Sequence, residues 1–147
     1  MIYFKFFVIG ILVFMFSACE KESVSGLAKV HWDRDMCTRC VMVVSDRKNT
    51  VQVANSLTGK KYMFDDIGCM TLWFSEENIN WKDKAVVWIT DVDSGEWINA
   101  RKAFYNPGNI TPMSFGFSAH KVKSSIKDAN EVLSYDEVLK IITENAR

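Results

Sequence analysis

The sequence predicts an α+β protein, built from two small ββαβ-like units that pack as one compact domain. Short runs of β-branched residues separated by turn residues predict strands, and these runs come in two groups. Each group is associated with a segment of helical periodicity, one in the middle of the chain and one at its end. The expected order is therefore β-β-α-β followed by β-β-α.

The first group of strands precedes the middle helix. The run 41–44 (VMVV) and the alternating run 50–54 (TVQVA) each predict a strand, with a turn between them. A turn that contains Gly59 follows, and the segment 62–64 is expected to pair back as a hairpin.

The middle helix is expected over residues 65–78. Asp65 is the expected N-cap, and Asp66 lies in the first turn, where the helix dipole favours a negative charge. Gly68 lowers the helix propensity slightly. Apolar residues recur at helical spacing on one face: Met63, Ile67, Met70 and Phe74.

The remaining strands and the last helix form the second half of the fold. A β-branched run predicts a buried strand over 85–91, and the segments 97–105 and 113–120 predict two further strands. Ser134 and Glu137 have the spacing of a capping box, which begins an amphipathic C-terminal helix.

The N-terminal segment has the pattern of a bacterial secretory signal. Lys5 is followed by the apolar block 6–16 and then by a Ser-Ala-Cys junction that ends at Cys19. The block is too short to span a bilayer, which needs about 20 apolar residues. The junction resembles a bacterial lipobox, and it predicts a signal peptide over residues 1–18 and a lipidated Cys19. A plain signal peptide with an unmodified cysteine is the alternative.

The rest of the chain is expected to be a tether and one folded domain. Residues 19–29 are polar, and residues 30–147 carry the predicted strands and helices. Glu20 stands where an Asp is associated with retention in the inner membrane, so we expect an anchor on the periplasmic side of the outer membrane. The formal net charge is zero, which predicts no nucleic-acid partner. Paired carboxylates, a phosphate-binding loop and a Ser/His/Asp arrangement are absent, so an enzyme is not expected.

The motif Cys37-x-x-Cys40 leaves several chemistries open. A zinc ribbon would need a second such pair or two histidines, whereas Cys69 is the only other thiol after Cys19. A thioredoxin-like redox pair would open a helix, but the residues after Cys40 have strand character. A structural disulfide would close a loop too small to remove much chain entropy. Cys69, inside an apolar helix, is expected to be a buried and inert thiol.

Methionines beside these thiols add copper to the possibilities. Met42 follows Cys40 by two residues, and soft sulfur ligands select Cu(I), although packing explains a single methionine equally well. Met113 follows Pro112, which fixes the backbone as a metal site requires. His120 could complete such a site with its imidazole, although an exposed histidine is the plainer interpretation.

Three segments together resemble the NosL family of periplasmic lipoproteins that accompany nitrous oxide reductase. They are MCTRCVMVVSD (36–46), YMFDDIGCM (62–70) and WINARKAFYNPGNITPMSFGFSAHK (97–121), and they occur in the family's order. The resemblance covers most of the chain between Asp35 and Lys121. One departure is Val41, where the family commonly has glycine.

The resemblance implies a membrane-tethered periplasmic metallochaperone for Cu(I). It would supply copper to nitrous oxide reductase or to the membrane complex that assembles the copper sites of this enzyme. It also implies ββαβ units similar to part of organomercurial lyase, in agreement with the predicted element order. The ligands that it implies are Cys40, Met42 and Met113, with Cys37 and His120 as second choices.

Two other classes of function stay open at the level of the sequence. One is a periplasmic thiol–disulfide oxidoreductase that uses Cys37 and Cys40. The other is a non-catalytic carrier lipoprotein with an incidental disulfide. In each case the domain is expected to be a monomer, held to the lipid bilayer through Cys19.

Overall fold

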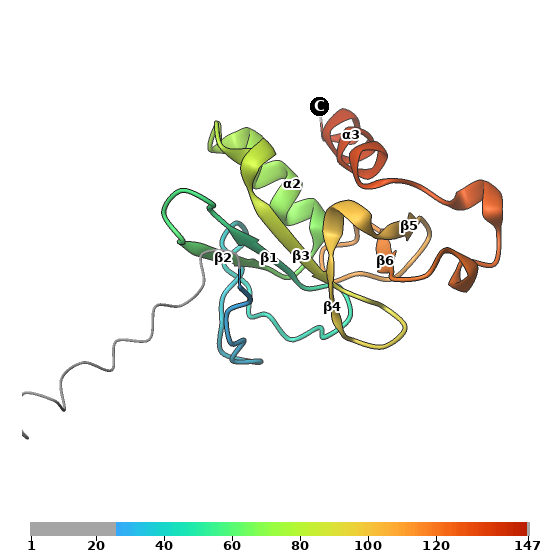
Figure 1. The fold of residues 1–147 in the computed structure, drawn as a ribbon, viewed down its shortest axis with the longest axis horizontal. Coiled ribbons are helices and arrows are strands. Elements are labelled where there is room, and N and C mark those ends of the chain that lie inside the picture. The colour runs from blue at the N-terminus through green and yellow to red at the C-terminus, as the bar shows by residue number, and fades with distance from the viewer. Residues whose placement is uncertain (1–25, 147) are drawn as a thin grey trace, which may run out of the picture.

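A computed structural model describes residues 26–146 as two antiparallel sheets and two α-helices (Figure 1). The α+β class predicted from the sequence is therefore confirmed. The predicted signal peptide, Cys19 and most of the polar tether lie outside the described residues. No helix within residues 26–146 is long and apolar enough to cross a membrane. In chain order the elements are β1 (Val51–Ala54), β2 (Lys61–Phe64), α2 (Ile67–Glu76), β3 (Val86–Thr90), β4 (Trp97–Asn99), β5 (Phe104–Asn106), β6 (Ser118–His120) and α3 (Tyr135–Asn145).

The first half of the chain forms the expected ββαβ unit from β1, β2, α2 and β3. The four-stranded sheet has the order β2-β1-β3-β4, and every residue of its inner strand β1 is buried. This strand pairs antiparallel with β2, where Val51 lies opposite Phe64, and with β3, where Val51 lies opposite Ile89. The helix α2 connects β2 to β3 and lies along the sheet (Figure 1). The predicted hairpin of 50–54 with 62–64 is confirmed.

The second half of the chain is divided between the two sheets. β4 completes the first sheet by pairing with β3, whereas β5 and β6 pair with each other. The single strand predicted over 97–105 is therefore wrong. The 3₁₀ turn η2 (Ala100–Lys102) interrupts it, because the side chain of Asn99 accepts a hydrogen bond from the Arg101 N–H and turns the chain.

The strand predicted over 41–44 is also wrong. Val43 makes only an isolated antiparallel bridge with Met36. Val41 has a φ of +60°, a left-handed conformation that an extended strand does not allow.

The strand predicted over 113–120 is shorter in the structure, where only β6 remains of it. Ser114 and Gly116 both have positive φ, 59° and 81°, and they turn the chain before β6 begins. Residues 111–116 therefore form a loop, and this loop lies against the start of α2.

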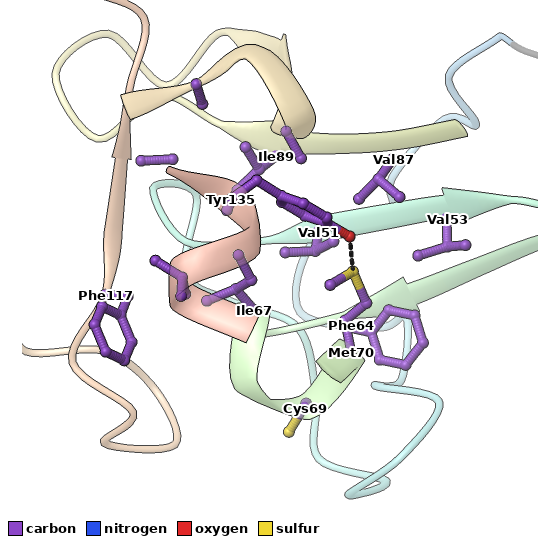
Figure 2. Close-up of a cluster of buried hydrophobic side chains, with 14 of the residues drawn as sticks. Val51, Val53, Phe64, Ile67, Cys69, Met70, Val87, Ile89, Phe117 and Tyr135 are labelled. Atoms are coloured by element: carbon purple, nitrogen blue, oxygen red, sulfur yellow. Dashed lines mark hydrogen bonds between the residues drawn. The ribbon is translucent and has the colours of Figure 1, made fainter. Parts of the chain in front are cut away.

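A hydrophobic core fills the space between the four-stranded sheet and the two helices (Figure 2). Valine and isoleucine side chains of β1 and β3 meet Phe64, Ile67 and Met70 in this core. Tyr135 lies over them at the start of α3, and its hydroxyl donates a hydrogen bond to the Met70 sulfur at 4.0 Å. Met70 is therefore a packing residue, as its place on the apolar helix face predicts.

The helix α3 begins at the capping box that the sequence predicts. The Ser134 side chain accepts a hydrogen bond from the Glu137 N–H, and the Glu137 carboxylate accepts one from the Ser134 N–H. Leu133, just before the cap, pairs with Tyr105 of β5 and so ties the helix start to the second sheet.

Candidate metal centre

Three thiols and one carboxylate meet between the loop 37–42 and the start of α2. They belong to Cys37, Cys40, Asp65 and Cys69, and their ligand atoms all lie within 4.8 Å of one another. All three thiols are free. Cys37, Asp65 and Cys69 are buried, whereas Cys40 is partly exposed. This thiol cluster has the donors and the spacing to enclose one metal ion.

Backbone hydrogen bonds fold the loop 37–42 so that its two thiols face α2. The Val41 N–H donates to the Cys37 carbonyl at 3.0 Å, and the Cys37 N–H donates to the Met42 carbonyl at 2.8 Å. The Thr38 N–H donates to the Met63 carbonyl at 2.7 Å, which joins the loop to β2. The loop is therefore fastened to the sheet on one side of the thiol cluster.

Val41 is a strained residue within this loop. Its φ of +60° is a conformation that β-branched residues rarely adopt, because the Cβ approaches the backbone carbonyl. A left-handed conformation costs an L-residue about 1–2 kcal/mol relative to the right-handed one. The glycine that is common at this position in the NosL family would adopt this backbone without strain.

The side chain of Arg39 fastens the same loop to the far end of α2. Its Nε and Nη2 groups donate to the two carboxylate oxygens of Glu76, at 2.9 and 2.8 Å. This hydrogen bonding lowers the pKa of Glu76 and raises the pKa of Arg39. The two cysteines of the motif thus flank a residue that is itself held to the helix.

The start of α2 is shaped by Asp66, which is the N-cap of the helix. The predicted N-cap, Asp65, is wrong by one residue, because the helix begins at Ile67 and Asp66 has the extended backbone of a cap. The Asp66 carboxylate accepts hydrogen bonds from the Gly68 N–H at 2.8 Å and the Met113 N–H at 3.3 Å. Asp65 is thereby left free to face Cys40.

Gly68 is required by close packing against the loop 111–116. A Cβ at this position would lie 2.0 Å from a ring carbon of Phe115, far inside van der Waals contact. The aromatic ring therefore rests directly on the first turn of α2, next to Cys69. The glycine that lowers the helix propensity of this segment makes room for this ring.

Electrostatics within the thiol cluster favour a single thiolate. A hydrogen bond from the Cys69 thiol lowers the pKa of Cys37 to about 4, against the opposing effect of burial, and backbone N–H groups add to it. The same hydrogen bond raises the pKa of Cys69. Burial raises the pKa of Cys40 to about 11. Burial, followed by the neighbouring Cys37, raises the pKa of Asp65 to about 6.

Asp65 is placed to exchange a proton with Cys40. The Cys40 thiol donates to the carboxylate of Asp65, with the sulfur 3.6 and 3.8 Å from the two oxygens. A metal ion that binds the Cys40 sulfur must displace this proton, because the thiolate is the ligand form of cysteine. The neighbouring carboxylate can accept it.

Cys69 is buried, as the sequence predicts, but it is part of the thiol cluster. Figure 2 shows its sulfur pointing away from Met70 and Phe64, which belong to the core. The sequence shows Asp65 and Cys69 close together along the chain, but Asp65 precedes the N-cap of α2, so helical spacing alone does not predict that they meet.

The other three predicted ligands are two methionines in loops and one histidine that belongs to a separate group of side chains. Met42 is the last residue of the loop 37–42 and is 52% exposed. Met113 is half-buried, and its backbone is tied to Asp66. His120 is grouped with Asp91 and Asp93 instead of the thiols, and it is only 7% exposed, so the expectation of an exposed histidine is wrong.

Comparison with known proteins identifies a similar fold. No family model and no curated protein sequence matches this chain. Among solved structures, the crystal structure of the copper chaperone NosL from Shewanella denitrificans is similar, with a TM-score of 0.60 and 16% sequence identity. The similar region covers 76% of this chain and 94% of that chain. The chain therefore has a NosL-like fold.

Proposed function

We propose that this protein is a metallochaperone that binds Cu(I) and passes it to a client protein. The observation that carries the proposal is the convergence of three thiols within 4.8 Å on a fold shared with a copper chaperone. Thiolates are soft ligands, and soft ligands select Cu(I). The partial exposure of one thiol fits a protein that must also release its ion.

The ligands that we propose are Cys37, Cys40 and Cys69. Asp65 completes the cluster as the acceptor for the proton that Cys40 loses when its sulfur binds the ion. Met42 lies exposed at the rim, where its thioether can meet an ion that enters or leaves. In this proposal His120 is not a copper ligand. The principal ligands are the three thiols, and the thioethers of Met42 and Met113 are not principal ligands.

Transfer of the ion would proceed by ligand exchange. Cys40 is the partly exposed thiol of the cluster, so a ligand of the client protein can approach the ion from its side. The buried sulfurs of Cys37 and Cys69 hold the ion while the ligands are exchanged. The ion then passes between the two proteins without being released into water.

The client that we propose is nitrous oxide reductase or its membrane copper-assembly complex, and the anchor is a lipid on Cys19. Three sequence segments that resemble the NosL family and the Ser-Ala-Cys junction support this part of the proposal. Tethering would raise the local concentration of the carrier near a membrane-bound assembly complex. Deletion of the protein should yield exported reductase that is poor in copper, and a fully copper-loaded reductase in the deletion strain would rule out this client.

Competition for Cu(I) tests the binding function directly. The reduced protein should remove about one Cu(I) from a chromogenic chelator and should prefer it to Zn(II). Cys40→Ser should weaken this binding strongly, whereas Met63→Leu, a matched change of a half-buried methionine on β2, should leave it intact. A protein that leaves Cu(I) with the chelator, or that binds Zn(II) more tightly, would contradict the proposal.

The lowered pKa of Cys37 favours a second candidate, a thiol–disulfide oxidoreductase, because a stable thiolate is a nucleophile. The geometry argues against it. Cys37 is only 1% exposed, and the motif lies in a loop of turns without the helix that follows a thioredoxin-type pair. We expect negligible reduction of insulin disulfides, and activity that Cys37→Ser removes would favour this candidate.

A further inference from the structure

A second group of metal-ligating side chains lies where the two sheets meet. It consists of Asp91 and Asp93, from the turn between β3 and β4, and His120 at the end of β6. Their ligand atoms lie within 4.8 Å of one another. Asp91 and His120 are buried, and Asp93 is half-exposed, so one side of the group is open to water.

Hydrogen bonds fix the orientation and the tautomer of His120. Its Nε2 lies 3.0 Å from Asn106 Oδ1, and this oxygen also accepts a hydrogen bond from the Asn109 side chain. Nε2 must therefore carry a hydrogen and donate it. The neutral imidazole then has its lone pair on Nδ1, which lies 2.9 Å from Asp93 Oδ2. A nitrogen lone pair and a carboxylate oxygen repel each other at this distance unless a positive charge lies between them.

The charge count favours a dication over a single proton at this position. Asp91 and Asp93 supply two negative charges, and protonation of His120 neutralises only one of them. Lys121, which follows His120 in the chain, directs its Nζ to Glu96 at 3.0 Å instead. A histidine that donates its second ring N–H to a carbonyl while the other nitrogen faces carboxylates also has the usual arrangement of a metal ligand.

We propose that His120 Nδ1, Asp93 and Asp91 form a binding site for a divalent cation of the Zn²⁺ class. Imidazole nitrogen and carboxylate oxygen are ligands of Zn²⁺, and three protein ligands leave a position for water on the exposed side. Its ligands differ in chemistry from those of the thiol cluster. The site is therefore independent of the proposed copper function, and it would join the β3–β4 turn of one sheet to the last strand of the other.

Titration with Zn²⁺ tests this site in the full chain, held in detergent micelles and with its thiols first saturated with Ag(I). Calorimetry should detect one Zn²⁺, and ¹⁵N NMR should show His120 with the metal on Nδ1 and a hydrogen retained on Nε2. Asp93→Asn and His120→Gln should each weaken Zn²⁺ binding by at least about tenfold.

The chain supplies a matched control, because its only other histidine also lies beside an aspartate. His31 Nδ1 is 3.4 Å from Asp35 Oδ1, but this pair is more exposed, and within residues 26–146 it belongs to no group with a second carboxylate. His31→Gln should leave Zn²⁺ binding unchanged. A doubly protonated His120 whose spectrum does not respond to Zn²⁺, or equal binding by wild type and Asp93→Asn, would overturn the proposal. Asp93 is half-exposed, so its variant tests the site without disturbing the core.

Discussion

The thiol cluster and the His120 site place a buried aspartate in opposite electrostatic surroundings. Burial raises the pKa of Asp65. Within the thiol cluster, the groups that donate hydrogen bonds to its carboxylate are thiols. Burial acts in the same direction on Asp91, but hydrogen bonds from Ser94 and from the Lys121 N–H outweigh it and lower its pKa. The difference indicates that hydrogen-bond donors, and not burial alone, set the direction in which the pKa of a buried carboxylate shifts. The first environment fits a soft ion held by sulfur ligands, and the second fits a hard dication.

The two regions also differ in how their turns are made. The β3–β4 turn places Gly95 at a φ of +76°, a conformation natural for glycine. The loop of the thiol cluster places Val41 at a φ of +60°, where a side chain is strained. Among the described non-glycine residues with positive φ, which are Asp33, Val41, Asn78 and Ser114, Val41 is the β-branched one, and it lies in the loop that carries Cys37 and Cys40.

Removal of one thiol is the strongest way to test the contrast between the two sites. We expect Cys69→Ser to weaken Cu(I) binding by about a hundredfold, or roughly 3 kcal/mol, because a hydroxyl is a poor ligand for a soft ion. Asp91→Asn, which changes the other site, should leave Cu(I) affinity unchanged in the same chelator competition. If Cys69→Ser binds normally while Met42→Leu and Met113→Leu do not, the thioethers are the principal ligands.

Packing at the start of α2 should be the next most sensitive feature. Gly68→Ala should lower the free energy of unfolding by about 2–3 kcal/mol, because its methyl group would overlap the Phe115 ring. Gly108→Ala is the matched control, since its Cβ would meet nothing within 4 Å and only its positive φ opposes the change. Urea unfolding of both variants measures the difference, and equal losses would show that Phe115 moves aside freely.

Removing a side chain from the loop of the thiol cluster and adding one to the β3–β4 turn should change the free energy of unfolding in opposite directions. Val41→Gly should raise the free energy of unfolding by about 1 kcal/mol, because glycine relieves the left-handed strain. Gly95→Ala should lower it by a similar amount, since its new Cβ would make only an ordinary 3.7 Å contact with the Arg47 carbonyl and the strain would dominate. Thermal and urea unfolding check both, and destabilisation by Val41→Gly would mean that the valine side chain supports the loop.

The smallest effect is expected outside both sites, at the capping box of α3. Hydrogen bonds from Ser134 lower the pKa of Glu137, so its carboxylate stabilises the fold at neutral pH. This contribution is present above the pKa of Glu137 in the unfolded chain and is lost as the pH falls through its lower value in the folded protein. Wild type should therefore be slightly more stable than Glu137→Gln at pH 7, and the two should converge in acid. A gap in unfolding midpoints that persists in acid would show that charge is not responsible.

Local patterns predicted the parts of the fold that depend on local chemistry. The alternation in 50–54 and the spacing of Ser134 with Glu137 act over a few residues, and both the hairpin and the capping box are confirmed. The segment 97–105 has strand-like composition throughout, but the cap that Asn99 supplies ends β4 within it. The residue composition of a segment does not predict where such a turn interrupts it.

The candidate site was only partly predictable for a related reason. Cys37 and Cys40 are close in sequence, so their motif was recognisable. The approach of Cys69 depends on how α2 lies against the loop 37–42, and an apolar helix gives no local sign of which buried face holds a site. His120 is buried because the β3–β4 turn covers it. This contact joins two sheets, so the local hydrophobic pattern of the sequence does not predict it.

The pairing of Arg39 with Glu76 has a kinetic consequence. In the transfer that we propose, an outward movement of the loop between the cysteines would widen the access to the ion beside Cys40, and this movement would break the pair. Both side chains are partly exposed, so dissolved ions weaken their attraction. The residence time of the bound ion should therefore shorten as the salinity around the protein rises, while the sulfur ligands that set its affinity remain the same.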